Sequence, residues 1–488
     1  MKTPRTVKVL QLMTSVISSI LHNEPLLLRG NLAQLDELGG IYIKFLQVVV
    51  LNLNPASQEN FLQLLSVFER SKPDAIEIYS YLRSIKVPHL ERFASIDPKP
   101  IGTGSFGQVY RAQLHSGEKV IIKILRPSVM RYIRYDLRLL NILSWFYSLA
   151  DRQKMLNFRD LYAEFRRTCL QEVNYTREAE AGTMFYERYK DHSTLVIPKT
   201  YREFCTPKVI VQDYIQGLSI TDLLTYQAQG NDPHKYVQEN YGSNLLDQLY
   251  TVGYEIVTNA LIGNIIQADP HPGNMILLPE GKIALIDFGM TTQLTSNRIA
   301  YYDMCVQYEA FYHDNIALEE LMIASLRFMS PKLYAAMNSA EAILGSGWDK
   351  ETLLNKIRES TLVSSMDEST QATVAGMIKE KRIMKILFFA INKGNRFGFT
   401  LDLQAIMLLK ATHSYMIMMA QFDKEGRTIA RALAGGTEFA RQHMSKVVDL
   451  KPQELAPHEA VEVLSNWFDK MSRNDPWLME KITGGQIK

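Results

Sequence analysis

The sequence contains few cysteines, with three in 488 residues: Cys169, Cys205 and Cys305. No two of them form a C-x-x-C pair, which argues against a disulfide framework or a cysteine zinc site and favours a reducing compartment, the cytoplasm. The chain also lacks an excess of charge of one sign, because 54 Lys and Arg face 52 Asp and Glu, a net charge of +2. Nucleic-acid binding through bulk positive charge is therefore not expected.

Long uninterrupted apolar runs are absent as well. Residues 137–150 and 403–420 are broken by polar side chains such as Arg138 and Lys410. Neither run provides the roughly 20 apolar residues of a membrane span, so both are predicted to be buried core helices. The first 22 residues carry no small-residue cleavage site, which argues against a secretory signal. They are open to three interpretations: a helix in peripheral contact with a membrane, a partner-binding helix, or a core helix.

The length predicts about three structural units, at roughly 150 residues each. Apolar residues at helical spacing predict mostly helical segments at 1–95, 131–190, 219–267 and 290–488. β-Branched residues punctuated by glycine predict a hairpin over 101–125 and shorter strands within 194–198, 208–214 and 275–289. We divide the chain into a helical N-terminal extension (1–95), a sheet-containing region with a helical insert (96–215), a helical region (216–435) and a C-terminal tail (436–488). The last forty residues are polar and are expected to be loosely packed.

A glycine-rich segment lies between the first two predicted strands. It reads Gly102-Thr103-Gly104-Ser105-Phe106-Gly107-Gln108-Val109. A dinucleotide fingerprint would need a strand before it and a helix after it, whereas a position between two strands is typical of kinases. Glycines let a backbone approach phosphates closely, so the segment predicts a nucleotide loop; an ordinary hairpin is the alternative. The expected nucleotide-binding residues are Gly102, Thr103, Gly104, Ser105, Gly107 and Val109.

A lysine on the second strand has the right place to hold phosphates. Lys123 follows Gly107 by 16 residues and is bracketed by β-branched residues, which predicts an ammonium beside the glycine loop. Such a lysine needs a carboxylate from a packed helix to orient it. Spacing leaves Glu172, Glu178 and Glu180 open for this role.

Two further motifs follow in kinase order. The spacing of Asp269 and Asn274 in D-P-H-P-G-N matches a D-x-x-x-x-N catalytic loop, in which the aspartate faces the attacking oxygen and the asparagine ligates a metal. Asp287 ends an apolar strand and begins D-F-G, where a carboxylate is costly unless it is paired or metal-bound. Oxygen ligands of this kind suit Mg²⁺ bridging the phosphates of ATP. The ordered motifs predict an α+β, bilobal protein-kinase-like fold with a small sheet and a mostly helical C-terminal part.

The D-P-H-P-G-N string resembles the catalytic loop of the UbiB/AarF family of atypical, coenzyme-Q-associated kinases. Residues 40–47 (GIYIKFLQ) resemble that family's K-x-G-Q signature, and residues 172–179 (EVNYTREA) resemble its E-x-D…E-A segment. The resemblance implies that Glu178 is the partner of Lys123 and that Glu172 pairs with Lys44. It also implies regulatory roles for Lys44, Gln47 and Glu172. It further implies a hinge-like segment, residues 211–217, whose Asp213 is expected to bind the nucleotide.

The sequence departs from the family pattern at four places. Leu46 stands where the family has glycine, Asn174 where it has aspartate, and Gln267 where it has histidine. The nucleotide loop is glycine-rich, whereas the family's loop is alanine-rich. In the family the alanine loop and the K-x-G-Q segment are thought to restrain transfer to proteins, so this chain keeps one restraint and relaxes the other.

No A-P-E follows residues 287–289 within forty residues, which disfavours a typical peptide-docking activation segment. The resemblance and the motifs predict an ATP- and Mg²⁺-dependent ATPase or kinase that acts on an isoprenoid lipid or quinone precursor. The acceptor stays open among water, lipid, small molecule and protein. One alternative is a serine/threonine protein kinase, which the glycine loop favours. The other is a nucleotide-binding pseudokinase or lipid-binding chaperone.

Overall fold

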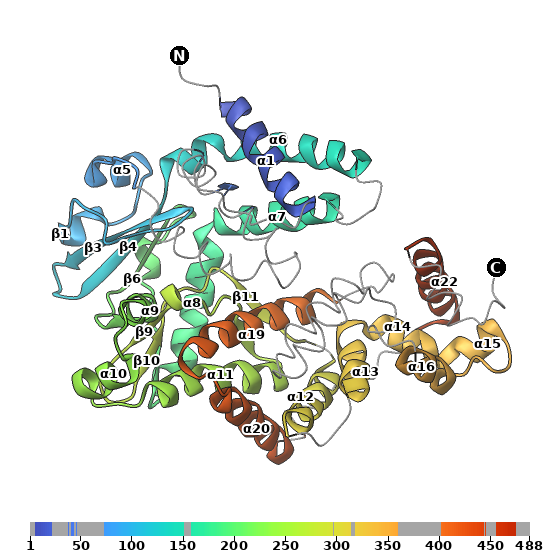
Figure 1. Ribbon diagram of the computed structural model, residues 1–488. Helices are drawn as coiled ribbons and strands as arrows, with labels where there is room; N and C mark the ends of the chain where they lie inside the picture. Colours follow the sequence, from blue (N-terminus) through green and yellow to red (C-terminus); the bar gives the residue numbers. More distant parts are fainter. Residues whose placement is uncertain are drawn as a thin grey trace. The chain divides into compact units, whose positions relative to one another are not determined.

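The computed structural model describes residues 5–21, 38, 41–42, 45, 73–150, 158–295, 297–313, 318–359, 402–443, 445 and 455–474. The chain forms two compact units. The first unit comprises residues 1–217 and 284–290, and the second comprises 218–283 and 291–488. Strand β10 (Ile283–Leu285) runs from the second into the first. Figure 1 shows the elements of each unit.

The first unit is built on an antiparallel sheet with the strand order β1-β3-β4-β6, and β2 pairs with β3. The strands are β1 (Phe93–Ile96), β2 (Gly102–Thr103), β3 (Gly107–Leu114), β4 (Lys119–Leu125) and β6 (Val209–Asp213), while β5 (Leu195–Val196) lies outside this sheet. Alternate side chains of β4, from Val120 to Ile124, are buried, as expected for a strand with one face on the core. The predicted hairpin over 101–125 is confirmed. The described part of residues 1–95 is mostly helical, as predicted, except that β1 begins at Phe93.

The helices of the first unit pack on this sheet and on one another. They are α1 (Arg5–Leu21), α5 (Ile78–Ser84), α6 (Pro127–Ala150), α7 (Phe158–Glu172) and α8 (Tyr175–Tyr189), with short 3₁₀ turns at Leu90–Arg92 and Arg202–Phe204. Asn174, the residue that departs from the family aspartate, caps α8, because its side chain accepts a hydrogen bond from Thr176 N at 3.1 Å. Asparagine and aspartate are equally favourable as N-cap residues. The asparagine therefore preserves the N-terminal cap of α8.

The second unit is mostly helical. Its helices are α9 (Ile220–Ala228), α10 (Pro233–Tyr241), α11 (Leu245–Leu261), α12 (Arg298–Tyr312), α13 (Leu318–Met329), α14 (Pro331–Ala336), α15 (Ala340–Leu344), α16 (Lys350–Glu359), α19 (Leu403–Phe422), α20 (Arg427–Gln442) and α22 (Pro457–Asn474). Its strands are β7 (Leu218–Ser219), β8 (Ile265–Gln267), β9 (Met275–Leu277) and β11 (Thr291–Gln293). β7 pairs with β9 and β8 with β11, both antiparallel. Residues 219–267 and the described part of 290–488 are mostly helical, as predicted, except for the short strands β8 and β11.

The C-terminal region is packed more closely than predicted. α22 contacts α14 and buries Ala460, Leu464 and Trp467 in a shared apolar cluster. The expectation of a loose tail is therefore wrong for residues 457–474. The predicted boundary between residues 435 and 436 is also wrong, because it falls inside α20.

The two apolar runs differ in burial. Residues 403–420 lie in α19, whose Leu408, Leu409 and Met419 are fully buried, as predicted. Residues 137–150 belong to α6, which has one buried face and one exposed face: Ile142 is 53% exposed. The expectation of a wholly buried helix is wrong there. Within the part of the chain that the structure describes, no helix has both the length and the apolarity to cross a membrane.

Candidate nucleotide site

Lys123 lies at the centre of an ion cluster in the first unit. Its Nζ donates to Glu178 Oε1 at 2.6 Å and to Asp287 Oδ2 at 2.7 Å. Glu178 comes from the first turn of α8, and Asp287 follows β10. The structure thus brings together three predicted residues that lie 55 and 164 positions apart. Glu178, rather than Glu172 or Glu180, is the carboxylate that Lys123 contacts. We call these three residues the Lys123 cluster.

The Lys123 cluster contains two carboxylates and one ammonium, so its acidic groups outnumber its basic group. Burial alone would lower the pKa of Lys123, but the charges of Asp287 and Glu178 outweigh it and raise that pKa well above 10.5. Burial, reinforced by the nearby Asp287, raises the pKa of Glu178 from 4.5 to about 7 despite the attraction of Lys123. One ammonium therefore serves two carboxylates, and a further cation would be stabilised beside them.

Tyr175 supports this cluster, and the motifs did not identify it. The Lys123 ammonium lies 5.2 Å from the centre of the Tyr175 ring, a cation–π contact. A Cβ at Gly107 would lie 2.6 Å from the Tyr175 hydroxyl and 3.7 Å from Lys123 Cε. Gly107 is therefore required by this close approach. The sequence did contain a signal for Tyr175: it lies three residues before Glu178 on α8, and residues i and i+3 share a face of a helix.

The glycine loop has more room at its other glycines. A Cβ at Gly104 would meet nothing nearer than 3.9 Å, and one at Gly102 nothing within 4 Å. Gly104 N donates to Gly107 O at 2.9 Å, which closes the turn between β2 and β3. Thr103 pairs with Gln108 across that turn, and Val109 faces Lys123 across β3 and β4. Ser105 is half-buried within the loop.

Asp287 and Phe288 are fixed to the first unit by different contacts. Asp287 Oδ1 accepts a hydrogen bond from Gly289 N at 2.9 Å, while its other oxygen accepts from Lys123. The ring of Phe288 is 1% exposed and lies 4.7 Å from the ring of Phe185 on α8. The D-F-G motif is thereby attached to the helix that carries Glu178.

The predicted catalytic loop lies in the second unit, between β8 and β9. Three donors meet the carbonyl oxygen of Asp269: Gln267 Nε2 at 2.7 Å, His271 N at 2.8 Å and Asn274 Nδ2 at 3.0 Å. His271 Nδ1 accepts from Gly273 N at 3.0 Å and starts the 3₁₀ turn Pro272–Asn274. These bonds hold the backbone of the loop rigidly. Gln267, where the family has histidine, supplies one of them.

The two predicted metal ligands, Asn274 and Asp287, lie in different units, and each is described by itself. The amide nitrogen of Asn274 is engaged by Asp269, which leaves its amide oxygen for a cation, and Asp287 supplies a carboxylate. Among the described residues, no three His, Cys, Asp or Glu side chains gather as a metal cage. Mg²⁺ commonly takes one or two protein ligands and completes its shell with phosphates and water. Each residue taken by itself therefore presents an oxygen of the kind that Mg²⁺ takes, and a shared Mg²⁺ site stays a prediction.

Four predicted residues remain, and the structure describes two of them, Asp213 and Glu172. The carboxylate of Asp213 accepts from Tyr201 Oη at 2.9 Å and from Lys199 N at 3.1 Å, so this side chain is engaged within the first unit. Nucleotide binding by Asp213 stays a prediction. Glu172 ends α7 and is half-buried. Lys44 and Gln47 lie outside the described residues, so the predicted Lys44–Glu172 pair remains a prediction.

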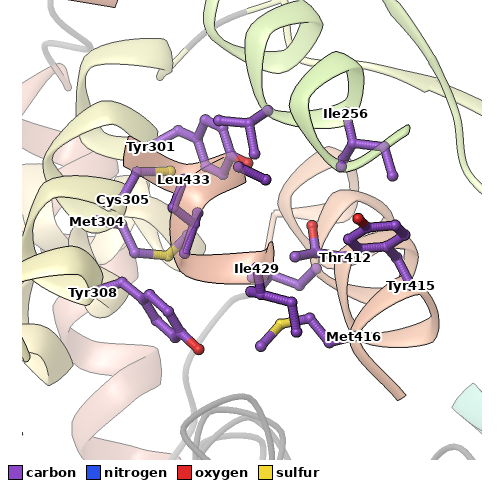
Figure 2. Close-up of a pocket in the computed structure, with 14 residues that line it drawn as sticks. Ile256, Tyr301, Met304, Cys305, Tyr308, Thr412, Tyr415, Met416, Ile429 and Leu433 are labelled. Carbon is purple, nitrogen blue, oxygen red and sulfur yellow. The ribbon is translucent and has the colours of Figure 1, made fainter. Parts of the chain in front are cut away.

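An apolar cavity in the second unit lies among α11, α12, α19 and α20. Figure 2 shows Tyr301, Met304, Thr412 and Met416 around it. Its volume is about 40 Å³, against about 150 Å³ for a cavity that admits benzene. The cavity is small, and of the two methionines beside it Met304 is buried whereas Met416 is half-buried.

The family model and two similar proteins point to the same family. The family model for the ABC1 atypical kinase-like domain matches residues 77–321. The Arabidopsis thaliana chloroplastic protein ACTIVITY OF BC1 COMPLEX KINASE 1 is 31% identical over 267 residues, 54% of this chain and 37% of that protein. The probable protein kinase UbiB of Azotobacter vinelandii is 29% identical over 285 residues, 56% of this chain and 50% of that protein. The matches thus span half or less of these relatives, and they confirm the predicted kinase-like fold class.

A solved structure gives a weaker similarity. The Mycobacterium tuberculosis Rv3197–erythromycin complex aligns with a TM-score of 0.38 at 22% identity. The alignment covers 52% of this chain and 62% of that chain. We base no functional statement on it.

Proposed function

Because the chain belongs to the ABC1 atypical kinase-like family, we propose that it binds ATP with Mg²⁺ and transfers the terminal phosphoryl group. The observation that carries this proposal is the Lys123 cluster, in which a partly buried ammonium lies between Glu178 and Asp287 at 2.6 and 2.7 Å. We infer that Lys123 holds phosphate oxygens and that Glu178 orients it and keeps it charged. Backbone amides of the glycine loop would hold further phosphate oxygens.

Each remaining residue has a role in positioning or charge. Asp269 orients the attacking oxygen and accepts its proton, on a loop whose backbone is fixed by three hydrogen bonds. Asn274 and Asp287 provide oxygen ligands for Mg²⁺, which would neutralise charge on the phosphates when bound. Catalysis of this type depends on positioning and electrostatics, because phosphoryl transfer needs no covalent enzyme intermediate.

For the acceptor, we propose water or a lipid-like molecule of isoprenoid-quinone metabolism. The resemblance of the D-P-H-P-G-N loop to the coenzyme-Q-associated UbiB/AarF family supports this choice, as does the absence of A-P-E in the forty residues after Gly289. The glycine-rich loop favours the second candidate, a serine/threonine protein kinase. A pseudokinase is the third, and the presence of every required side-chain type argues against it.

The central test is Asp287→Asn, assayed by phosphate release from ATP with Mg²⁺. We expect turnover to fall by at least about 100-fold, because a ligand and a charge at the transferring group are lost together. The matched control is Asp232→Asn, which keeps the cap of α10 in the second unit. Wild-type turnover in Asp287→Asn would refute the proposal. ATP binding by the wild type without phosphate release would favour the pseudokinase, and labelling of protein substrates would favour the protein kinase.

We also propose that the exposed face of α6 contacts an anionic membrane surface. Tyr135, Ile142 and Trp145 are 45–53% exposed and share a face with exposed Arg138, at helical spacing. The acidic residue of α6, Asp136, is fully buried and paired with Arg5 at 2.6 Å. Aromatic rings interleaved with arginines, without exposed acids, are typical of interfacial helices.

Vesicle flotation tests this contact. The wild type should bind phosphatidylglycerol vesicles more strongly than phosphatidylcholine vesicles, and Ile142→Ser should weaken binding several-fold. Met184→Ser is the matched control, because Met184 is 54% exposed on α8. Equal binding by both variants, or no preference for anionic lipid, would contradict this assignment.

A further inference from the structure

A second ion pair, between buried Arg126 and half-buried Asp74, lies against the glycine loop, outside every motif identified in the sequence. Arg126 follows β4 directly, and Asp74 precedes α5. Nε and Nη2 of Arg126 donate to Asp74 Oδ1 at 3.1 and 2.9 Å. Nη1 of the same guanidinium donates to the carbonyl oxygen of Gly104 at 3.2 Å. One side chain therefore joins the segment before α5 to the centre of the nucleotide loop.

The partner of Arg126 is itself held in place. Ser128 donates to the Asp74 carboxylate from its backbone N at 2.8 Å and from its hydroxyl at 2.9 Å. Gln108, which is fully buried, exchanges two hydrogen bonds with the Asp74 backbone, at 3.0 and 3.2 Å. Burial opposes ionisation of Asp74, but the hydrogen bonds from Ser128 and Arg126 lower its pKa. The arginine thus has a rigid, charged anchor.

The contact at Gly104 adds to the other constraints on the loop, which are the pairing of β2 with β3 and the hydrogen bond from Arg126 N to Phe106 O at 2.9 Å. Gly104 has open space on its Cβ side, and its peptide is fixed by the bond from Gly104 N to Gly107 O and by Arg126. A loop that is ordered before binding loses less conformational entropy when phosphates arrive. We propose that Arg126 is a positioning residue for the nucleotide loop, and that Asp74 makes nucleotide affinity depend on the segment before α5. This inference rests on the proposed ATP binding.

The test is Arg126→Lys in the full-length chain. A lysine keeps a positive charge opposite Asp74 but cannot span both acceptors as a guanidinium does. We expect the Kd for Mg²⁺–ATP to rise about tenfold, as for loss of one hydrogen bond from a charged group. At saturating ATP, kcat for phosphate release should stay within about twofold of the wild type, since the reacting groups are unchanged.

Arg5→Lys is the matched control. Arg5 also bridges a buried carboxylate, Asp136 at 2.6 Å, and a backbone carbonyl, Leu38 O at 2.7 Å. It lies on α1 rather than at the loop, so its substitution should cost similar stability and leave the Kd unchanged. Equal Kd changes in both lysine variants, or none in Arg126→Lys, would overturn the positioning role.

Amide hydrogen exchange over residues 102–108 without nucleotide gives a readout that does not require ATP binding. It should be faster in Arg126→Lys and unchanged in Arg5→Lys. If Arg126→Lys does not fold, Asp74→Asn replaces it with the same expectations. Unchanged exchange would overturn the inference while leaving the proposed function intact, whereas a wild type that binds no ATP would overturn the proposed function itself.

Discussion

Gly107→Ala offers a sharp test of the geometry around Lys123. The added methyl would lie 2.6 Å from the Tyr175 hydroxyl, and ordinary contact begins near 3.4 Å. The two groups must therefore separate by about 0.8 Å, while Tyr175 is packed in the core of the first unit with 3% exposure. Overfilling of this kind typically costs about 1–3 kcal/mol.

The measurement is thermal unfolding without nucleotide, compared with Gly104→Ala. A cost of 1–3 kcal/mol corresponds to a Tm decrease of about 2–10 °C for a unit of this size. Gly104→Ala, whose methyl has 3.9 Å of clearance, should change Tm by less than about 1 °C by the same scaling. Adding Tyr175→Phe to Gly107→Ala should recover part of the loss, because it removes the atom that clashes. Equal Tm values for the two alanine variants would refute this account of the loop.

Two other substitutions test packing and charge. Gly436→Ala places a methyl 2.2 Å from Val257 Cγ1 between α20 and α11; we expect about 1–3 kcal/mol of destabilisation in chemical unfolding, and an unchanged midpoint would contradict this close packing. Glu178 has a folded-state pKa of about 7 against 4.5, so the folded state binds its proton more tightly. Its contribution to stability is complete below pH 4.5 and is lost as the pH rises through about 7. Glu178→Gln should flatten the stability profile between these values, and a slope equal to that of the wild type would contradict the pKa shift.

The sequence predicted those elements whose formation depends on residues close together in the chain. The hairpin over 101–125 follows from alternating β-branched residues and a turn at Gly117, whose φ is +101°. The strands β8 and β11 were missed because each has three residues and exists through pairing with the other, which no local pattern encodes.

The candidate site likewise contains residues that the sequence predicted and residues that it did not predict. Lys123, Glu178 and Asp287 carry motif spacing, and the resemblance chose Glu178 from three glutamates that spacing could not separate. Asp74 and Arg126 carry no motif and lie 52 positions apart, so only the folded chain reveals their contact. The exposed face of α6 was missed because apolar side chains point both inward and outward along it, and composition does not distinguish the two.

The anchoring of Phe288 has a consequence for inhibitors. Its ring is buried against Phe185, and emptying a phenylalanine-sized space costs about 3–5 kcal/mol. A compound that occupies the space of this ring must supply that energy before it gains any net affinity, a penalty of at least 100-fold in Kd at about 1.4 kcal/mol per tenfold change. Compounds that contact only the ammonium of Lys123 and the hairpin above it avoid this penalty. Chemical libraries for this protein should therefore begin with compounds that leave the ring of Phe288 in place.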